Sequence, residues 1–128
     1  MTTPVATQVG AFEMTAPCYA ALMDLHRLAE ARSLAIHAEI ARRLLSGAPI
    51  LPQARAVLRQ WIGEGGLAPE YGRQWTEWLS RDPEDVAALL TDPGESACAL
   101  RQNSPFVGIV SPRERWAIWE DVRRRAGR

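Results

Sequence analysis

The side chains with the clearest chemical potential are two histidines and one glutamate. His26 and Glu30 are four residues apart, which places them on one face of a helix. Imidazole and carboxylate groups bind divalent metals and exchange protons. His37 lies 11 residues after His26, about 16 Å along an unbroken helix, so one ion reaches both only if the helix breaks. A small enzyme or metal-binding protein that uses His26, Glu30 and His37 is one hypothesis. The alternative is an exposed His26–Glu30 pair and a packed His37.

A catalytic nucleophile is harder to find. Cys18 lies eight residues before His26, and no GxSxG string occurs. The glycines around Glu64 resemble a phosphate loop only superficially, because the chain has no lysine to bind a phosphate. Glu84 and Asp85 are adjacent, and adjacent side chains on a helix point about 100° apart. We expect a protein that is not an enzyme and has no catalytic residue, no metal and no cofactor.

Tryptophan and arginine are the residues best suited to binding another protein. The sequence has 5 tryptophans, four of them in WTEW and WAIW, and all 15 of its basic residues are arginine. Both residue types are enriched at binding hot spots. Two plainer explanations stay open. A high-GC genome favours arginine codons, and tryptophan fills a large volume in a core, where we expect three or four of the five.

The best candidate interface surrounds the string SPFVGIV, which joins the last two predicted helices. Proline at its head and glycine in its middle indicate a loop. If exposed, this loop would bind a partner together with the helix that follows it. If buried, it would close the end of the core with Phe106 and Ile109, and the sequence leaves both arrangements open. The predicted partner-binding residues are Arg101, Ser104, Pro105, Phe106, Arg113, Arg115, Trp116 and Arg123.

Helices must position these groups, and apolar spacing predicts helices along most of the chain. Residues 17–45 keep helical spacing, which predicts one rod of about 45 Å that overhangs the domain or two helices with a break near residues 31–33. Asp82 and Asp92 each precede a proline and predict capped helix starts. The string SPRE, beginning at Ser111, predicts a capping box. Other helices are expected over residues 52–62 and 69–80.

These elements together predict an all-α protein, a compact bundle of six to seven helices with no sheet. The chain has 128 residues, 47% of them hydrophobic, which suits one domain and is enough to form a core. We expect a single helical domain over residues 17–126. Residues 1–16 carry no apolar period and are predicted to form a flexible N-terminal tail.

Charge limits the choice of partners. The net charge is zero, so the chain as a whole is not attracted to nucleic acid or to an anionic membrane. The distribution is uneven: residues 64–95 hold 8 acidic residues and 2 arginines, and residues 113–128 hold 6 arginines and 3 acidic residues. The basic C-terminus keeps a contact with nucleic acid open. No signal peptide, membrane span or cysteine framework is evident, and we expect a cytoplasmic protein.

One part of the sequence resembles a known group of proteins. The string LRQNSPFVGIVSPRERWAIW, preceded by IHAEIARRLL, is similar to an LRxxSPFxG and PRxRW pattern in short helical proteins of high-GC bacteria, over roughly residues 31–123. The resemblance links the chain to antitoxin-like partners encoded beside toxin genes. It implies a non-enzymatic protein that binds a toxin and covers its site. The matching positions are Leu100, Arg101, Ser104, Pro105, Phe106, Gly108, Pro112, Arg115 and Trp116.

Three functional hypotheses result. The leading one is a protein–protein interaction module, namely an antitoxin-like partner that binds and neutralises a toxin encoded nearby. The first alternative is a DNA-associated transcriptional regulator that uses the arginine-rich C-terminus. The second alternative is the small enzyme or metal-binding protein with His26, Glu30 and His37. A homodimer is open under each of them.

Overall fold

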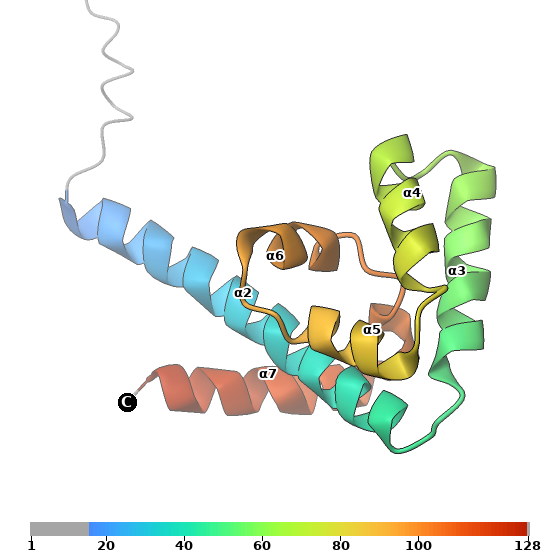
Figure 1. The fold of residues 1–128 in the computed structure, drawn as a ribbon. Coiled ribbons are helices and arrows are strands. Elements are labelled where there is room, and N and C mark those ends of the chain that lie inside the picture. Colours follow the sequence, from blue (N-terminus) through green and yellow to red (C-terminus); the bar gives the residue numbers. More distant parts are fainter. Residues whose placement is uncertain (1–15, 128) are drawn as a thin grey trace, which may run out of the picture.

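A computed structural model describes residues 16–127, and all regular secondary structure in that range is helical (Figure 1). Six α-helices and one short 3₁₀ helix are present there, with no strand, so the predicted all-α class is confirmed for this part of the chain. The predicted tail, residues 1–16, lies outside the described residues except for Ala16. The elements are α2 (Ala16–Leu45), α3 (Ile50–Glu64), α4 (Pro69–Trp78), α5 (Pro83–Leu90), α6 (Glu95–Arg101), η1 (Val107–Ile109) and α7 (Pro112–Ala126).

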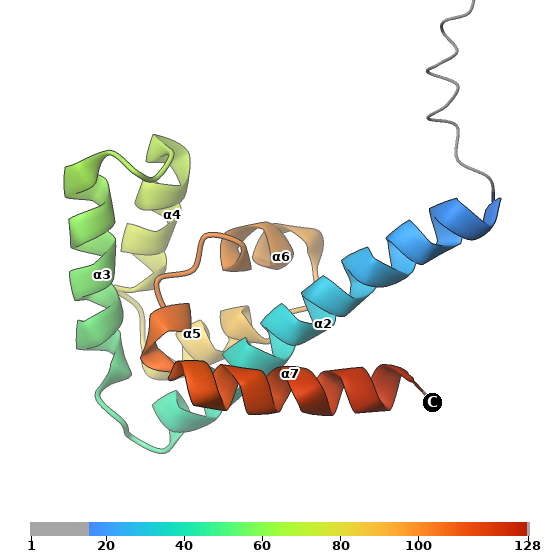
Figure 2. The same cartoon turned by 180° about the vertical axis from the view of Figure 1, so that it is seen from behind.

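The longest element, α2, is one unbroken helix of 30 residues, so the overhanging rod is the correct one of the two predicted arrangements. Its second half lies in the core, where Ile36, Ile40 and Leu44 are 3%, 0% and 4% exposed. None of residues 18–35 is buried. The first half projects past the short helices α5 and α6, and α7 runs antiparallel to α2 along one side (Figures 1 and 2). Within the described residues no helix, α2 included, has the length and apolar character needed to cross a membrane.

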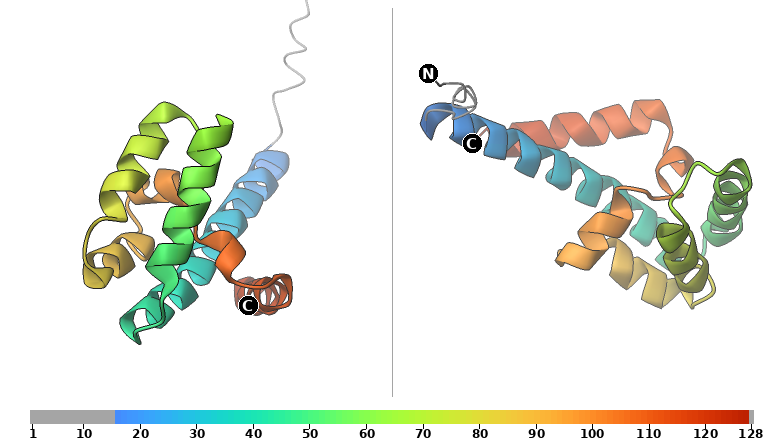
Figure 3. Two further views of the ribbon diagram at one scale, coloured as in Figure 1. Left: turned by 90° about the vertical axis from the view of Figure 1, so that its right-hand side faces the viewer. Right: turned by 90° about the horizontal axis from the view of Figure 1, so that it is seen from above.

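The remaining helices build the core around the second half of α2. The most extensive contacts of α2 are with α5 and α7, and α3 pairs with α4 at the end of the molecule away from the start of α2 (Figure 3). At the centre of the core, the rings of Trp75 and Phe106 meet in a T-shaped contact with centroids 5.9 Å apart. Both side chains are fully buried, and Val86, Leu90 and Leu100 belong to the same apolar cluster.

Two helices begin at other residues than predicted. α3 begins at Ile50, and Pro52 falls in its first turn, where backbone amides have no helical acceptor and a missing N–H is tolerated. α6 begins at Glu95 rather than directly after Asp92. The Asp92 carboxylate accepts a hydrogen bond from the Gly94 amide at 2.8 Å, which forms a turn ahead of the helix.

The capping box at the start of α7 is confirmed. The Glu114 amide donates to the Ser111 hydroxyl at 3.2 Å, and the Ser111 amide donates to the Glu114 carboxylate at 3.0 Å. Asp82 occupies the N-cap position of α5, as predicted, but its side chain makes no capping hydrogen bond. Ser111 and Glu114 therefore fix the start of α7, and they help to fix the positions of the side chains that this helix exposes.

Candidate interaction surface

The segment between α6 and α7 is buried. Ser104 is 6% exposed, and Pro105 and Phe106 are among the fully buried side chains. Ile109 is half-buried and packs against the core. Of the two arrangements that the sequence leaves open, the structure has the one that closes the core. Ser104, Pro105 and Phe106 are predicted partner contacts, but the structure leaves almost none of their surface in reach of a partner.

His37 binds this segment from the middle of α2. Its Nδ1 lies 2.7 Å from the Ser33 carbonyl oxygen, which can only accept, so Nδ1 carries the proton. Nε2 is then an acceptor, and the Ser104 hydroxyl donates to it over 2.7 Å. Burial lowers the pKa of His37 from 6.5 to about 4, against the raising effect of the Ser33 bond and with a smaller contribution from the charge of Arg101. His37 is therefore neutral at pH 7 and packed inside.

The three residues of the metal or acid–base hypothesis are not brought together. His26 and Glu30 form an exposed pair, with Nε2 and Oε2 3.6 Å apart, whereas His37 is fully buried. Because α2 does not break, the two histidines stay about three helical turns apart. Among residues 16–127, no group of three histidine, cysteine, aspartate or glutamate side chains is placed to hold a metal ion.

Arg101 is used inside the fold, at the C-terminal end of α5. It is 5% exposed, and its Nη1 donates to the carbonyl oxygens of Leu89, Leu90 and Asp92 at 3.3, 3.3 and 2.7 Å. Carbonyls at the end of a helix lack donors from within the helix, and the helix dipole favours a cation there. Arg101 is a predicted partner contact, but the structure uses its guanidinium inside the fold and leaves little of it exposed.

Two other arginines bind helix ends in the same way. Arg55 of α3 donates from Nε and Nη2 to the Leu79 carbonyl, just after α4, at 3.0 and 2.8 Å. Arg115, which is half-buried, donates to the carbonyls of Val107 and Val110 at 3.2 and 2.6 Å, at either end of η1. A guanidinium presents five donors in a fixed fork, which suits such contacts better than an ammonium group. Arg115 thus supports the buried segment more than it presents a surface.

The exposed side of α7 holds the other predicted residues. Trp116 is 60% exposed and meets Trp119 in a T-shaped contact with ring centroids 6.5 Å apart. The Arg32 guanidinium of α2 lies over the Trp119 ring, 5.4 Å from its centroid. Arg113 and Arg123 are exposed at neighbouring angular positions of the helix. We call Arg113, Trp116 and Arg123 the α7 face.

The other tryptophans differ in burial. Trp75 is fully buried, Trp78 and Trp119 pack against the core with part of each ring exposed, and Trp61 is half-buried. The Arg81 guanidinium covers the outer side of Trp78, 4.1 Å from the ring centroid. Trp116 is therefore the one among the five that presents most of its surface to solvent.

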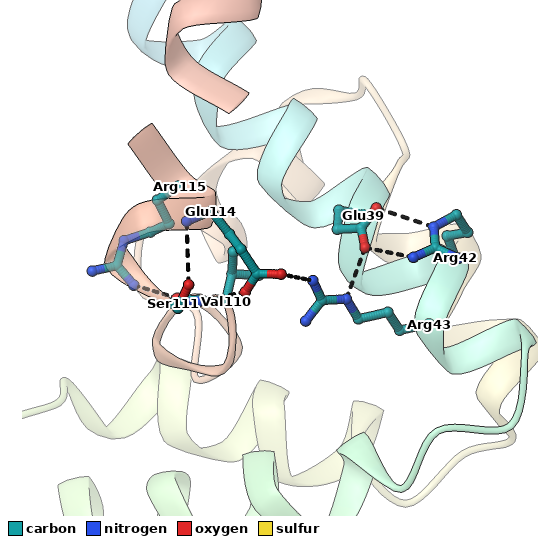
Figure 4. A network of polar contacts seen from close by, with 7 residues as sticks. All are labelled: Glu39, Arg42, Arg43, Val110, Ser111, Glu114 and Arg115. Carbon is teal, nitrogen blue, oxygen red and sulfur yellow. Dashed lines mark hydrogen bonds and ion pairs between the residues drawn. The ribbon is translucent and has the colours of Figure 1, made fainter. Parts of the chain in front are cut away.

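A polar network ties the start of α7 to α2 (Figure 4). Glu39 accepts hydrogen bonds from Arg42 at 2.7 Å and from Arg43 at 2.8 Å. Arg43 also donates to Glu114 at 2.6 Å, and the same carboxylate completes the capping box with Ser111. Hydrogen bonds from Arg42 and then from Arg43 lower the pKa of Glu39 to about 2. The first turn of α7 is thus held both by its cap and by α2.

The last turn of α7 is basic, and its arginines pair with carboxylates on the same helix. Arg123 lies 3.3 Å from Glu120, and Arg124 and Arg125 lie 2.7 and 2.9 Å from Asp121. Cations are favourable at a helix C-terminus, so helix stability accounts for this pattern. Contact with DNA stays a prediction, and no feature of this turn favours it.

A further exposed region, which the sequence analysis did not single out, lies where α2 projects. The first half of α2 and the end of α7 border an open groove of about 750 Å³. Exposed apolar side chains follow α2 at three-residue spacing, and this spacing is the sequence signal that could have revealed the region. We call it the overhang surface, and its apolar members are Tyr19, Leu22, Leu25, Leu28, Ala31 and Ala126.

Comparisons with known proteins add no constraint on function. The sequence matches no protein-family model, no curated protein and no solved structure at significant similarity. The resemblance of residues 31–123 to antitoxin-like proteins therefore stays a prediction from the motif. The function has to be inferred from the residues and the geometry of the surfaces themselves.

Proposed function

We propose that this protein is a non-enzymatic protein–protein interaction module, an antitoxin-like partner that binds and neutralises a toxin through the α7 face. The observation that carries the proposal is the 60% exposure of Trp116 on a well-anchored helix. Tryptophan buries a large area when it is covered and is among the residues most enriched at binding hot spots. A partner that covers this ring removes an unfavourable apolar surface from water.

The surroundings of Trp116 favour tight binding. Trp119 contacts the ring edge-on, and Arg32 lies over Trp119 in turn. The ion pair between Arg43 and Glu114 holds the helix start on α2. A side chain that is held in place before binding loses little conformational entropy when a partner covers it. A larger share of the favourable contact energy between Trp116 and the partner therefore contributes to the binding free energy.

The charges beside Trp116 indicate what the partner offers. Arg113 and Arg123 lie on either side of it along α7 and carry the two exposed guanidinium groups of the α7 face. Exposed charges of this kind steer association and select a partner of opposite charge more than they add affinity. The expected partner surface is an apolar pocket with carboxylates at its rim.

The test is a pull-down of the full chain, tagged at the N-terminus, from the native host. The protein retained in stoichiometric amount through a salt wash is identified by mass spectrometry, and its gene is expressed alone and together with this chain. We expect the partner alone to stop growth and co-expression to restore it. We further expect the Trp116→Ala variant to lose most of the restoration.

Leu45→Ala is the matched control, because Leu45 is also 60% exposed and lies at the far end of α2. It should restore growth as the unchanged chain does. The proposal is wrong if no retained protein inhibits growth, if co-expression leaves the inhibition in place, or if Trp116→Ala restores growth as fully as Leu45→Ala.

A further inference from the structure

The overhang surface is apolar, yet few of residues 16–127 pack against it. Tyr19, Leu22 and Leu25 are 56%, 50% and 64% exposed. No residue from 18 to 35 is buried, although these residues form an unbroken helix. An isolated helix of this length is only marginally stable in water and normally gains stability by packing an apolar face. Within the described residues, α7 lies along one side of this part of α2 (Figure 2), and α6 approaches residues 26–33 on another side.

The apolar residues spread round the helix, so α7 cannot cover them all. Each step of three residues turns the side chain by about 60° backward round the helix axis, which spreads Tyr19, Leu22 and Leu25 over about 120°. Leu25 lines the groove beside α7, and the other two lie progressively further round. Leu28 and Ala31 continue the same drift, so the full set from Tyr19 to Ala31 spreads over about 240°, wider than the stripe of roughly 100° with which a helix faces a single neighbour.

The size of the surface fits a dimer interface. Residues 18–35 of α2 extend for about 27 Å, and two neighbouring helices together are about 20 Å wide. A face of these dimensions is on the scale of the roughly 800 Å² that each subunit of a stable complex buries. The first half of α2 and the end of α7 lie at one end of the molecule, clear of α3 and α4, so a second molecule can approach them (Figure 3).

Charge favours a second copy of the same chain as the occupant. The rim of the groove carries one acidic residue, Asp24, and two basic residues, Arg27 and Arg123. Each of these side chains is more than 60% exposed. In a dimer with two-fold symmetry, every contact between two rim residues occurs twice, once in each half of the interface. A rim that contains both acidic and basic residues can therefore form the same ion pairs in both halves. The chain also has zero net charge, so two copies do not repel each other overall.

We propose that the overhang surface is a homodimer interface, in which two α2 helices pack antiparallel about a two-fold axis and the ends of the two α7 helices flank them. The result is a four-helix arrangement built from two identical helix pairs. Leu22, Leu25 and Leu28 form its apolar centre, with Asp24 and Arg123 along the edge beside α7 and the exposed His26–Glu30 pair along the opposite edge. Arg123 belongs both to this interface and to the α7 face, but the inference does not depend on the proposed toxin-binding function, which centres on Trp116.

The test is the mass of the full chain in solution, measured by light scattering and sedimentation over a wide range of concentrations. We expect a species of twice the 14.2 kDa chain mass that dissociates on dilution. The double variant Leu22→Arg/Leu25→Arg removes apolar contacts and places like charges across the axis. It should raise the dissociation constant of the dimer by roughly 100-fold or more.

Leu45→Arg is the matched control, because Leu45 is an exposed leucine of the same helix outside the overhang surface. It should dimerise as the unchanged chain does, and circular dichroism should show the same helix content in all three proteins. A chain that stays monomeric at every concentration overturns the proposal, as does a double variant that dimerises as tightly as Leu45→Arg. Trp116→Ala separates the two proposals, since it should lose the toxin and keep the dimer.

Discussion

The Nε2 atom of His37 and the hydroxyl oxygen of Ser104 are 2.7 Å apart, and this bond joins the middle of α2 to a segment 67 residues further along the chain. The same hydroxyl accepts a hydrogen bond from the Phe106 amide at 3.1 Å, which fixes the turn that carries the Phe106 ring into the core. A histidine that accepts a hydrogen bond must be neutral at that nitrogen. The buried segment between α6 and α7 therefore depends on the protonation state of His37.

The stability of the fold should fall as the pH is lowered through the weakly acidic range. In the unfolded chain His37 binds a proton below pH 6.5, whereas in the folded chain its pKa is about 4. The unfolded state therefore binds more protons between these values, and the free energy of unfolding decreases as the pH falls from 6.5 to 4. The loss attributable to this residue is about 3 kcal/mol in total. Urea denaturation at a series of pH values measures it.

Three variants test the roles of His37 and of its hydrogen bond to Ser104. His37→Gln should remove most of the pH dependence in this range, whereas His26→Gln, at the exposed histidine, should leave it in place. Ser104→Ala removes the donor and leaves a buried acceptor without a partner, which should lower the free energy of unfolding by about 1–3 kcal/mol. Equal pH profiles for the unchanged chain and His37→Gln would contradict the assignment.

Phe106→Ala should be among the most destabilising single substitutions in the chain. The ring is fully buried and packs edge-on against Trp75, so its removal leaves a cavity at the centre of the core. Truncations of this kind lower the free energy of unfolding by about 3–5 kcal/mol. Thermal and urea denaturation measure the change, and Val107→Ala, at a half-buried neighbour, is the control and should cost far less. A loss below that of Val107→Ala would show that the segment is not part of the core.

The sequence predicts features of this fold that depend on neighbouring residues. The capping box at Ser111 and Glu114 needs only side chains three residues apart, and it forms as expected. The helical spacing of residues 17–45 predicts helix throughout but leaves a break near residues 31–33 open, and the structure has the unbroken helix. Asp92 shows the limit of local reasoning, because its carboxylate can cap a helix or close a turn with Gly94, and the structure has the turn.

Burial of the candidate site could not be predicted, because it depends on contacts between distant residues. Phe106 is in the core because it meets Trp75, and Ser104 is buried because His37 binds it from α2. Arginine is usually exposed on protein surfaces, but Arg101 is buried because carbonyl groups at the end of α5 accept its hydrogen bonds. No local pattern distinguishes these residues from an exposed proline–phenylalanine loop beside an arginine.

Arg101 should contribute to stability through the carbonyls that it binds. Arg101→Met keeps much of the side-chain volume but removes the donors, so the carbonyls of Leu90 and Asp92 lose the guanidinium, whereas that of Leu89 keeps the Asp92 amide. Loss of hydrogen bonds from a charged group to buried acceptors should lower the free energy of unfolding by about 2–3 kcal/mol. Arg73→Met is the control, because Arg73 is exposed and lies 3.9 Å from Glu70, and it should change stability by less than about 0.5 kcal/mol. Urea denaturation at pH 7 compares the two, and similar losses would show that the carbonyl contacts add little.

The anchoring of α7 should influence partner binding without any direct contact to the partner. Ser111→Ala removes the capping hydroxyl and frees the first turn of α7, which should lower the free energy of unfolding by about 1 kcal/mol. Glu114 then loses one of the groups that orient it towards Arg43, so α7 is held less firmly on α2. Trp116 begins the next turn, and a ring that is less well fixed loses more entropy on binding.

We therefore expect Ser111→Ala to weaken partner binding several-fold, chiefly through faster dissociation, while Trp116 itself is unchanged. Surface plasmon resonance with the retained partner measures both rates. Ser96→Ala, at an exposed serine of α6, is the matched control and should change neither rate. Dissociation from Ser111→Ala at the rate of Ser96→Ala would mean that the cap serves the helix alone and that the α7 face does not depend on how firmly its first turn is held.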